Sequence, residues 1–211
     1  MKHSLSKVLA AMGVMLAGLV SCGGQNANID APKAVAVASF DAMRASDWAT
    51  YATTLHTEAL QGFQAQIING LGQIIPRDSL GNPSDSVMIL GQMFDTQQLF
   101  VEQPDSFMVK ILGTLFTSAP DLKQAFSTIQ NEILGGIYEG DNIAHLVIRN
   151  QYMFQNEPVE EMSVATLRLA DGQWKMMLSH QVRGVADMLI QGLIQQAQTQ
   201  ARMQMQPQGN Q

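Results

Sequence analysis

Cysteine is almost absent from this chain, since Cys22 is the only one among 211 residues. A single cysteine excludes an internal disulfide and a zinc site built on cysteine thiolates. Charge is also scarce: Asp, Glu, Lys and Arg make up 14% of the residues, and the formal net charge is −6. An acidic chain offers no basic surface for nucleic acid, so we expect no nucleic-acid partner. The hydrophobic fraction of 46% is ordinary and is enough for the core of one domain.

The position of Cys22 suggests why one cysteine is present. Lys2 and Lys7 lie in the first seven residues, and residues 8–20 (VLAAMGVMLAGLV) carry no charge. A basic start followed by about a dozen apolar residues is typical of an export signal, and this run is too short to span a membrane as a helix by itself. A core cysteine and a catalytic thiol are the other two roles for such a residue, and neither explains its place directly behind this run.

The segment Leu19-Val20-Ser21-Cys22 resembles the bacterial lipoprotein signal. The resemblance implies that residues 1–21 are cleaved, that the Cys22 sulfur carries diacylglycerol, and that the new amine is acylated. Three acyl chains would make membrane anchoring essentially permanent, because one chain alone gives only marginal binding of about 10⁴ M⁻¹. Gly23 stands where Asp favours inner-membrane retention in proteobacteria, so the resemblance favours the outer membrane of a bacterial cell envelope. The alternative is a plain secretory signal with an accidental cysteine.

Residues 22–30 are expected to form a flexible tether, followed by one domain over residues 31–200. Helical spacing of apolar residues predicts a first helix over residues 31–45, capped by Asp30. A second helix is expected to begin at Ser46, with Trp48, Tyr51, Ala52 and Leu55 on one apolar stripe.

A third helix is predicted over residues 57–75, and residues 76–86 (PRDSLGNPSDS) are expected to form a loop. Residues 87–130 are expected to form several short helices that start near three capping residues, Asp95, Asp105 and Ser118. This Met-rich stretch is expected to pack into the core or to cover a pocket, and an adaptable binding surface is the alternative.

After residue 130 the apolar period changes from 3.6 to 2, which indicates strands within residues 135–154, 158–170 and 172–182. Asp171-Gly172 is typical of a two-residue hairpin turn. Gly135-Gly136 predicts a bend at the start of the first strand. A C-terminal helix over about residues 183–200 and a disordered Gln-rich tail over residues 201–211 complete the chain. The sequence therefore predicts an α+β domain, in which a curved antiparallel sheet of about four strands packs on N-terminal helices.

The hairpin turn at Asp171-Gly172 predicts that Leu167 faces Met176 and Ser163 faces His180. In the preceding hairpin, a turn centred on residues 156 and 157 pairs Phe154 with Val159. One face of this sheet is then apolar, with Ala144, Leu146, Ile148, Ala165, Leu167, Leu169, Trp174, Met176 and Leu178. The other face carries His145, Arg149, Gln151, Thr166, Arg168, Lys175 and Ser179.

Toward one end the apolar face carries a polar cluster of Asn150, Tyr152, Glu161, Ser163 and His180. Buried polar groups must be paired or hydrated, so the cluster predicts the mouth of a cavity. With Trp48 and Tyr51 from the second helix, these residues are the predicted ligand-binding set.

Three segments, SDWATYATTLH, YEGDNIAHLVIR and LADGQWKMML, resemble the nuclear transport factor 2-like superfamily, also called the cystatin-like α+β cone. The resemblance covers about residues 31–60 and 133–182. It implies a curved sheet wrapped around helices with a pocket between them, in a family of some enzymes and many non-enzymatic binding proteins. The chain departs from the family pattern in an inserted helical region over about residues 61–130 and in its C-terminal helix.

Three functions remain open from the sequence. The favoured one is a membrane-anchored, non-enzymatic protein that binds a small apolar ligand or a partner. The second is an isomerase- or cyclase-like enzyme in which His180 acts as a general base with Glu161 or Asp47, with His56 as a further candidate. The third is an envelope scaffold that binds a protein through the inserted helices. No metal and no cofactor is expected, because too few ligands converge. The sequence leaves the oligomeric state open.

Overall fold

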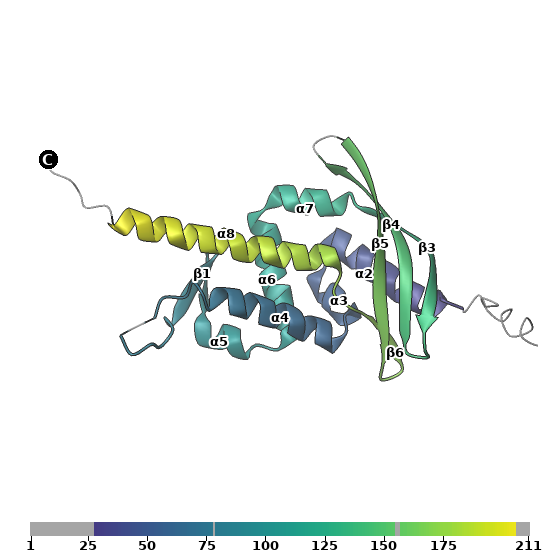
Figure 1. Ribbon diagram of the computed structural model, residues 1–211, viewed down its shortest axis with the longest axis horizontal. Coiled ribbons are helices and arrows are strands. Elements are labelled where there is room, and N and C mark those ends of the chain that lie inside the picture. The colour runs from purple at the N-terminus through teal and green to yellow at the C-terminus, as the bar shows by residue number, and fades with distance from the viewer. Residues whose placement is uncertain (1–27, 78, 155–156, 206–211) are drawn as a thin grey trace, which may run out of the picture.

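The computed structural model describes residues 28–77, 79–154 and 157–205, which form an α+β fold (Figure 1). The elements in chain order are α2 (Asp30–Ala45), α3 (Trp48–Thr54), α4 (Thr57–Leu71), β1 (Ser86–Ile89), β2 (Gln92–Asp95), α5 (Thr96–Val101), α6 (Pro104–Ser118), α7 (Pro120–Ser127), β3 (Gln130–Glu139), β4 (Ile143–Phe154), β5 (Glu157–Ala170), β6 (Gln173–Met176) and α8 (His180–Met205). The predicted fold class is confirmed. Cys22 and the rest of the expected signal and tether up to residue 27 lie outside the described residues.

The main sheet is antiparallel, with the strand order β3-β4-β5-β6. Asp171 and Gly172 form the β5–β6 turn with φ of 51° and 75°, the left-handed conformation that such two-residue turns need. Leu169 pairs with Trp174 and Leu167 with Met176, so this predicted hairpin register is confirmed.

The predicted register between β4 and β5 is wrong by two residues. Phe154 pairs with Glu157 instead of Val159, which places Asn150 opposite Glu161. A two-residue shift does not exchange the faces, because side chains alternate with a period of two. The apolar face is therefore the predicted one, with Ala144, Leu146, Ile148, Ala165, Leu167, Met176 and Leu178 buried, and with Trp174 half-buried and Leu169 38% exposed.

The predicted pairing of Ser163 with His180 is also wrong. Strand β6 ends at Met176, and His180 is the first residue of α8. The Ser179 side chain accepts a hydrogen bond from the Val182 backbone N–H at 3.3 Å, as an N-cap residue does. Three residues after the last strand pair, Ser179 already caps this helix.

Gly135 and Gly136 lie inside β3 rather than at its start, and the register against β4 shifts between Ile133 and Gly135. A Cβ atom on Gly136 would lie 2.7 Å from the His145 carbonyl oxygen. Only glycine allows the two backbones to approach this closely, so the predicted bend is a β-bulge that curves the sheet.

Helices α2 and α3 pack on the apolar face of the sheet, and α8 runs from the sheet across α4 (Figure 1). The His56 backbone N–H donates to the Met176 carbonyl at 2.9 Å, which fixes the end of α3 to the last strand. The predicted stripe on α3 is confirmed, since Trp48, Tyr51, Ala52 and Leu55 are all buried. A second part of the core joins α4, α6 and α8 through Phe63, Ile67, Phe107, Ile111 and Leu189.

Several predicted helix starts are shifted. Asp47 rather than Ser46 caps α3, because Ser46 adopts the left-handed conformation that ends α2. The N-cap of α2 is Ile29, with Asp30 already in the first turn. Asp95 caps α5 as predicted, but Asp105 lies in the first turn of α6 and Ser118 is its last residue. In both α6 and α7 a proline starts the helix, where its missing N–H is tolerated.

The inserted region is not wholly helical, because β1 and β2 form a hairpin at residues 86–95. Leu90 and Gly91 make its turn, both with positive φ. The helix at the C-terminal end is longer than predicted and reaches Met205, so the expected disordered tail is wrong for residues 201–205. Residues 206–211 lie outside the described residues. Among the helices that the structure describes, none combines the length and the apolar character that a membrane span requires.

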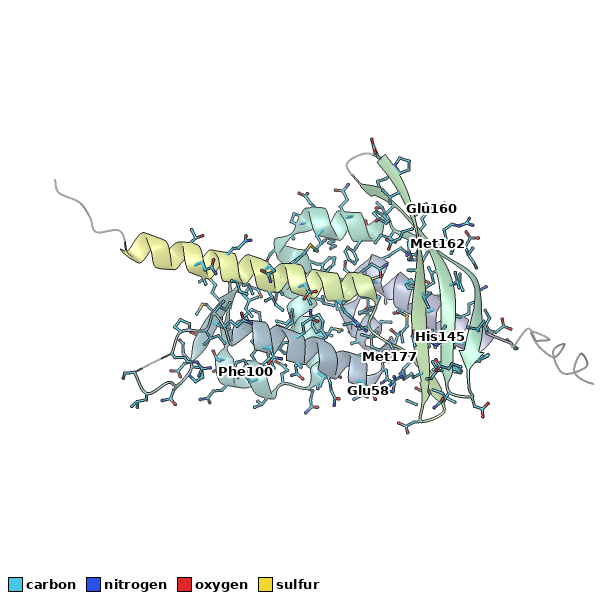
Figure 2. All side chains as sticks on the ribbon, in the orientation of Figure 1. Glu58, Phe100, His145, Glu160, Met162 and Met177 are labelled. Atoms are coloured by element: carbon cyan, nitrogen blue, oxygen red, sulfur yellow. The ribbon has the colours of Figure 1, made fainter. Side chains whose placement is uncertain are left out.

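The opposite face of the sheet carries the predicted polar residues of the strands together with exposed apolar ones. Ser179 was predicted there as well, and this is wrong, because it follows the end of β6 and caps α8. Arg149 lies between two carboxylates, with its Nη1 atom 3.3 Å from Glu132 Oε2 and its Nε atom 3.6 Å from Glu160 Oε1. His145 Nε2 lies 2.9 Å from Glu139 Oε2. Met162 pairs with Arg149 across the strands and is 53% exposed (Figure 2). This face is therefore solvated, as the alternating pattern predicted.

Candidate functional site

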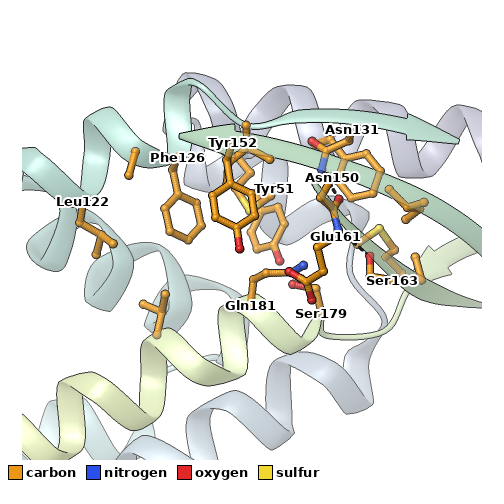
Figure 3. A pocket seen from close by; sticks show the side chains of 18 of the residues that line it. Tyr51, Leu122, Phe126, Asn131, Asn150, Tyr152, Glu161, Ser163, Ser179 and Gln181 are labelled. Carbon is orange, nitrogen blue, oxygen red and sulfur yellow. Dashed lines mark hydrogen bonds between the residues drawn. The ribbon is translucent and has the colours of Figure 1, made fainter. Parts of the chain in front are cut away.

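A cavity of about 390 Å³ lies between the apolar face of the sheet and the helices that cover it. Its walls come from α2, α3, α7, the inner face of the sheet and the first turns of α8 (Figure 3). Most of the lining is apolar, including Phe40, Met43, Leu122, Phe126, Ile129, Ile148, Val185 and Met188. A concave, mainly apolar space with a few polar groups is typical of a site for a small molecule.

One wall of the cavity is a chain of hydrogen bonds across three strands. The Asn131 side-chain amide Nδ2 donates to the Asn150 side-chain oxygen Oδ1 at 2.8 Å. The Asn150 side-chain Nδ2 in turn donates to the Ser163 hydroxyl at 2.7 Å. Asn150 is only 3% exposed, so these bonds provide the partners that a buried amide needs. The wall is consequently rigid and polar within an otherwise apolar lining.

Tyr51 supplies a second polar group, from α3. Its side chain is 1% exposed, and its hydroxyl has no hydrogen-bond partner among the described residues. Burial raises the pKa of this hydroxyl well above its usual value, and the nearby Ser179 side chain only partly offsets the rise. The Ser179 side chain lies near this hydroxyl without forming a hydrogen bond of acceptable geometry to it. Tyr51 therefore presents an uncharged, unpaired O–H group.

Glu161 enters from β5, on the same side of the cavity as Ser179 and Gln181 at the start of α8 (Figure 3). Its side chain is exposed to solvent, so it lies at the rim rather than in the depth of the cavity. Tyr152 from β4 is half-buried, and its ring also lines the space. Four residues of the predicted polar cluster, Asn150, Tyr152, Glu161 and Ser163, thus lie on the cavity wall together with Tyr51.

The other predicted site residues lie elsewhere or have structural partners. Trp48 is buried against Phe116, with the ring centroids 4.5 Å apart, and does not line the cavity. Asp47 accepts from the Thr50 backbone N–H at 3.0 Å, and this bond, with a second from the Thr50 hydroxyl, lowers the pKa of its carboxyl group. His56 caps α4 by accepting from the Glu58 backbone N–H at 3.2 Å.

His180 begins α8 between two residues that line the cavity, Ser179 and Gln181. The strand register that placed it opposite Ser163 does not exist, so the catalytic pair of His180 and Glu161 loses its sequence-based argument. Within the described ranges, the structure brings together no group of three or more His, Cys, Asp or Glu residues that could hold a metal ion.

Sequence reasoning missed the part of the wall formed by Asn131, Ser179, Gln181 and the residues of α7. Ser179 could have been found, because a serine three residues before an apolar helical position is a helix-start signal. Asn131 could not, because its role depends on the bulged register of β3 against β4.

The inserted region neither exposes a continuous apolar patch nor is fully buried. Between residues 87 and 117 the exposed large apolar side chains are Met88, Met93 and Val101, whereas Phe107, Met108, Ile111 and Leu112 are buried. Met88 and Met93 face each other across the β1–β2 hairpin. Most of the predicted Met-rich stretch therefore serves as core.

No protein-family model matches the chain, and no curated protein matches it. Among solved structures, it is similar to the crystal structure of an NTF-2 like protein of unknown function from Shewanella oneidensis MR-1. The TM-score is 0.38 and the sequence identity is 11%, over 70% of this chain and 93% of that chain. The α+β architecture described above stands on this chain's own strands and helices, and membership of the nuclear transport factor 2-like superfamily stays a prediction from the sequence pattern.

Proposed function

We propose that this protein binds a small, mainly apolar molecule in the cavity between the sheet and α2, α3, α7 and α8, without chemical conversion. The observation that carries the proposal is the buried, unpaired hydroxyl of Tyr51 on the wall of a mainly apolar cavity of about 390 Å³. Leaving a buried polar group unpaired costs roughly 1–3 kcal/mol, and a bound molecule with a polar group would remove this penalty.

Binding can be tested with N-phenyl-1-naphthylamine, an uncharged dye whose fluorescence rises in apolar surroundings. Ala125 lies on α7 at the rim of the cavity and is exposed, so Ala125→Trp should fold normally and fill the opening. We expect the dye to bind the unaltered protein and the affinity to fall at least tenfold in Ala125→Trp. Gln124→Trp is the matched control, because Gln124 is exposed on the same helix and does not line the cavity. Equal dye affinity in the two variants would place the dye elsewhere and refute the proposal.

We further propose that the domain is held at a bacterial membrane, with an outer-membrane address, by lipid on Cys22. The proposal rests on the apolar run of residues 8–20 and on the Leu19-Val20-Ser21-Cys22 segment. A lipid-anchored binding domain would work at the membrane surface, where apolar ligands are concentrated.

Metabolic labelling with an alkyne fatty acid, followed by membrane fractionation, tests the anchor. We expect label and membrane association in the unaltered chain and loss of both in Cys22→Ala. Ser21→Ala keeps a small residue before Cys22 and serves as the control. A Cys22→Ala protein that still sediments with the outer membrane would show that lipid on this residue is not the anchor.

A further inference from the structure

The structure points to the chemical class of the ligand: we infer that the cavity selects an uncharged amphiphile, whose hydroxyl or carbonyl oxygen accepts a hydrogen bond from Tyr51. This inference rests on the proposed function. It adds that molecules with the same apolar body but an anionic head group are rejected.

The donors in the cavity call for an oxygen acceptor on the ligand. The Tyr51 hydroxyl is buried and unpaired among the described residues, and the Ser163 hydroxyl accepts from Asn150. The raised pKa of Tyr51 keeps its proton in place at neutral pH, so the group remains a donor. A hydroxyl or carbonyl oxygen on the ligand can accept this hydrogen.

The electrostatics of the cavity disfavour an anion. Glu161 is the one charged side chain among the described residues that line the cavity, and no lysine or arginine accompanies it there. In Figure 3 the Glu161 side chain lies on the side of the cavity where the Tyr51 hydroxyl ends. A carboxylate bound to Tyr51 would lose hydration in an apolar lining with no lysine or arginine to pair with it, and the exposed Glu161 carboxylate at the rim would add like-charge repulsion.

The binding partner that satisfies both conditions is an uncharged oxygen group on an apolar body, such as an alcohol, ketone or ester. The remaining lining from α2, α7 and α8 is apolar and is suited to an alkyl or ring system. The chemistry fixes this class and leaves the shape of the apolar body to experiment.

The test is competition of two eight-carbon compounds, 1-octanol and octanoate, against bound N-phenyl-1-naphthylamine at pH 7. The alkyl chain of octanoate is one methylene shorter, which is worth about fourfold, so a larger difference reports the head group. We expect 1-octanol to displace the dye at least tenfold more effectively than octanoate. Octanoate competing as well as 1-octanol would overturn the inference while leaving the proposed function intact. No dye binding at all would refute the proposed function itself.

Two pairs of variants separate the contributions of the named residues. Glu161→Gln should improve competition by octanoate relative to 1-octanol about threefold, because Glu161 is exposed and its charge is screened by water. Glu160→Gln removes the same charge from the neighbouring residue, which lies near Arg149 on the outer face of the sheet. This variant should change competition by neither octanoate nor 1-octanol. Tyr51→Phe should weaken 1-octanol about fivefold relative to the dye, the effect of one hydrogen bond. Tyr138→Phe is its control, because the Tyr138 hydroxyl donates to the Asn28 carbonyl outside the cavity. Unchanged 1-octanol affinity in Tyr51→Phe, or unchanged octanoate affinity in Glu161→Gln, would refute the assigned roles.

Discussion

Replacing Tyr51 with Phe should make the ligand-free protein more stable, although it removes a polar group from the candidate site. The ring is 1% exposed and stays in place in Phe, so no packing is lost. The hydroxyl has no partner among the described residues, and removal of an unpaired buried polar group recovers its desolvation penalty. An unpaired buried polar group costs roughly 1–3 kcal/mol. Because the Ser179 side chain lies near the hydroxyl, we expect the lower value, a gain of about 1 kcal/mol at pH 7.

The same substitution should change how stability depends on pH. Burial raises the pKa of Tyr51 in the folded protein above its ordinary value of 10.0. The unfolded chain therefore loses this proton first, and the stability that depends on it is complete below pH 10 and falls as the pH rises further. Above pH 10 the unaltered protein should therefore lose roughly 1 kcal/mol of stability per pH unit, and Tyr51→Phe should not show this loss.

Urea unfolding followed by tryptophan fluorescence at pH 7, 9, 10 and 11 measures both effects. The difference between the two proteins isolates Tyr51, because all other groups titrate alike in both. The stability advantage of Tyr51→Phe should grow from about 1 kcal/mol at pH 7 to about 2 kcal/mol at pH 11. Tyr138→Phe should instead lower stability at pH 7, since it removes a hydrogen bond to Asn28. A constant difference from pH 7 to 11 would refute the argument that Tyr51 is desolvated and unpaired.

Further predictions concern helix packing and the polar wall. Gly62→Ala should stabilise the protein by about 0.5–1 kcal/mol, because its helix position opens onto free space. Gly70→Ala in the same helix should destabilise it by about 1 kcal/mol or more, because its Cβ would lie 2.6 Å from Ile190 of α8. A stabilised Gly70→Ala protein in thermal unfolding would show that α4 and α8 are not packed closely. Asn150→Ala should cost about 1–3 kcal/mol in urea unfolding, because it strips buried partners such as Ser163 of their hydrogen bonds; an unchanged midpoint would refute a dry polar wall.

Much of the sheet could be predicted from local pattern. The alternation over residues 143–170 assigned Leu146 and Leu167 to the buried face, and a two-residue register error at Phe154 did not alter it. The hairpin at Asp171-Gly172 followed from turn chemistry alone. Helix ends were predicted less well, since Ser46, Asp47 and Ser118 are all chemically suited to cap a helix and only backbone geometry selects among them.

Side chains on a strand alternate whatever the strand packs against, so the local pattern was enough to place a polar group of Asn150, Tyr152, Glu161 and Ser163 in an otherwise apolar sheet face. The pattern did not show that this group lines a cavity, that Asn131 completes its hydrogen bonds, or that Tyr51 faces it without a partner among the described residues. It also did not show that α8 begins at His180 and so takes this residue out of the strands. A cavity depends on which helices cover a sheet and how closely they approach it, and these are contacts between residues far apart in the chain.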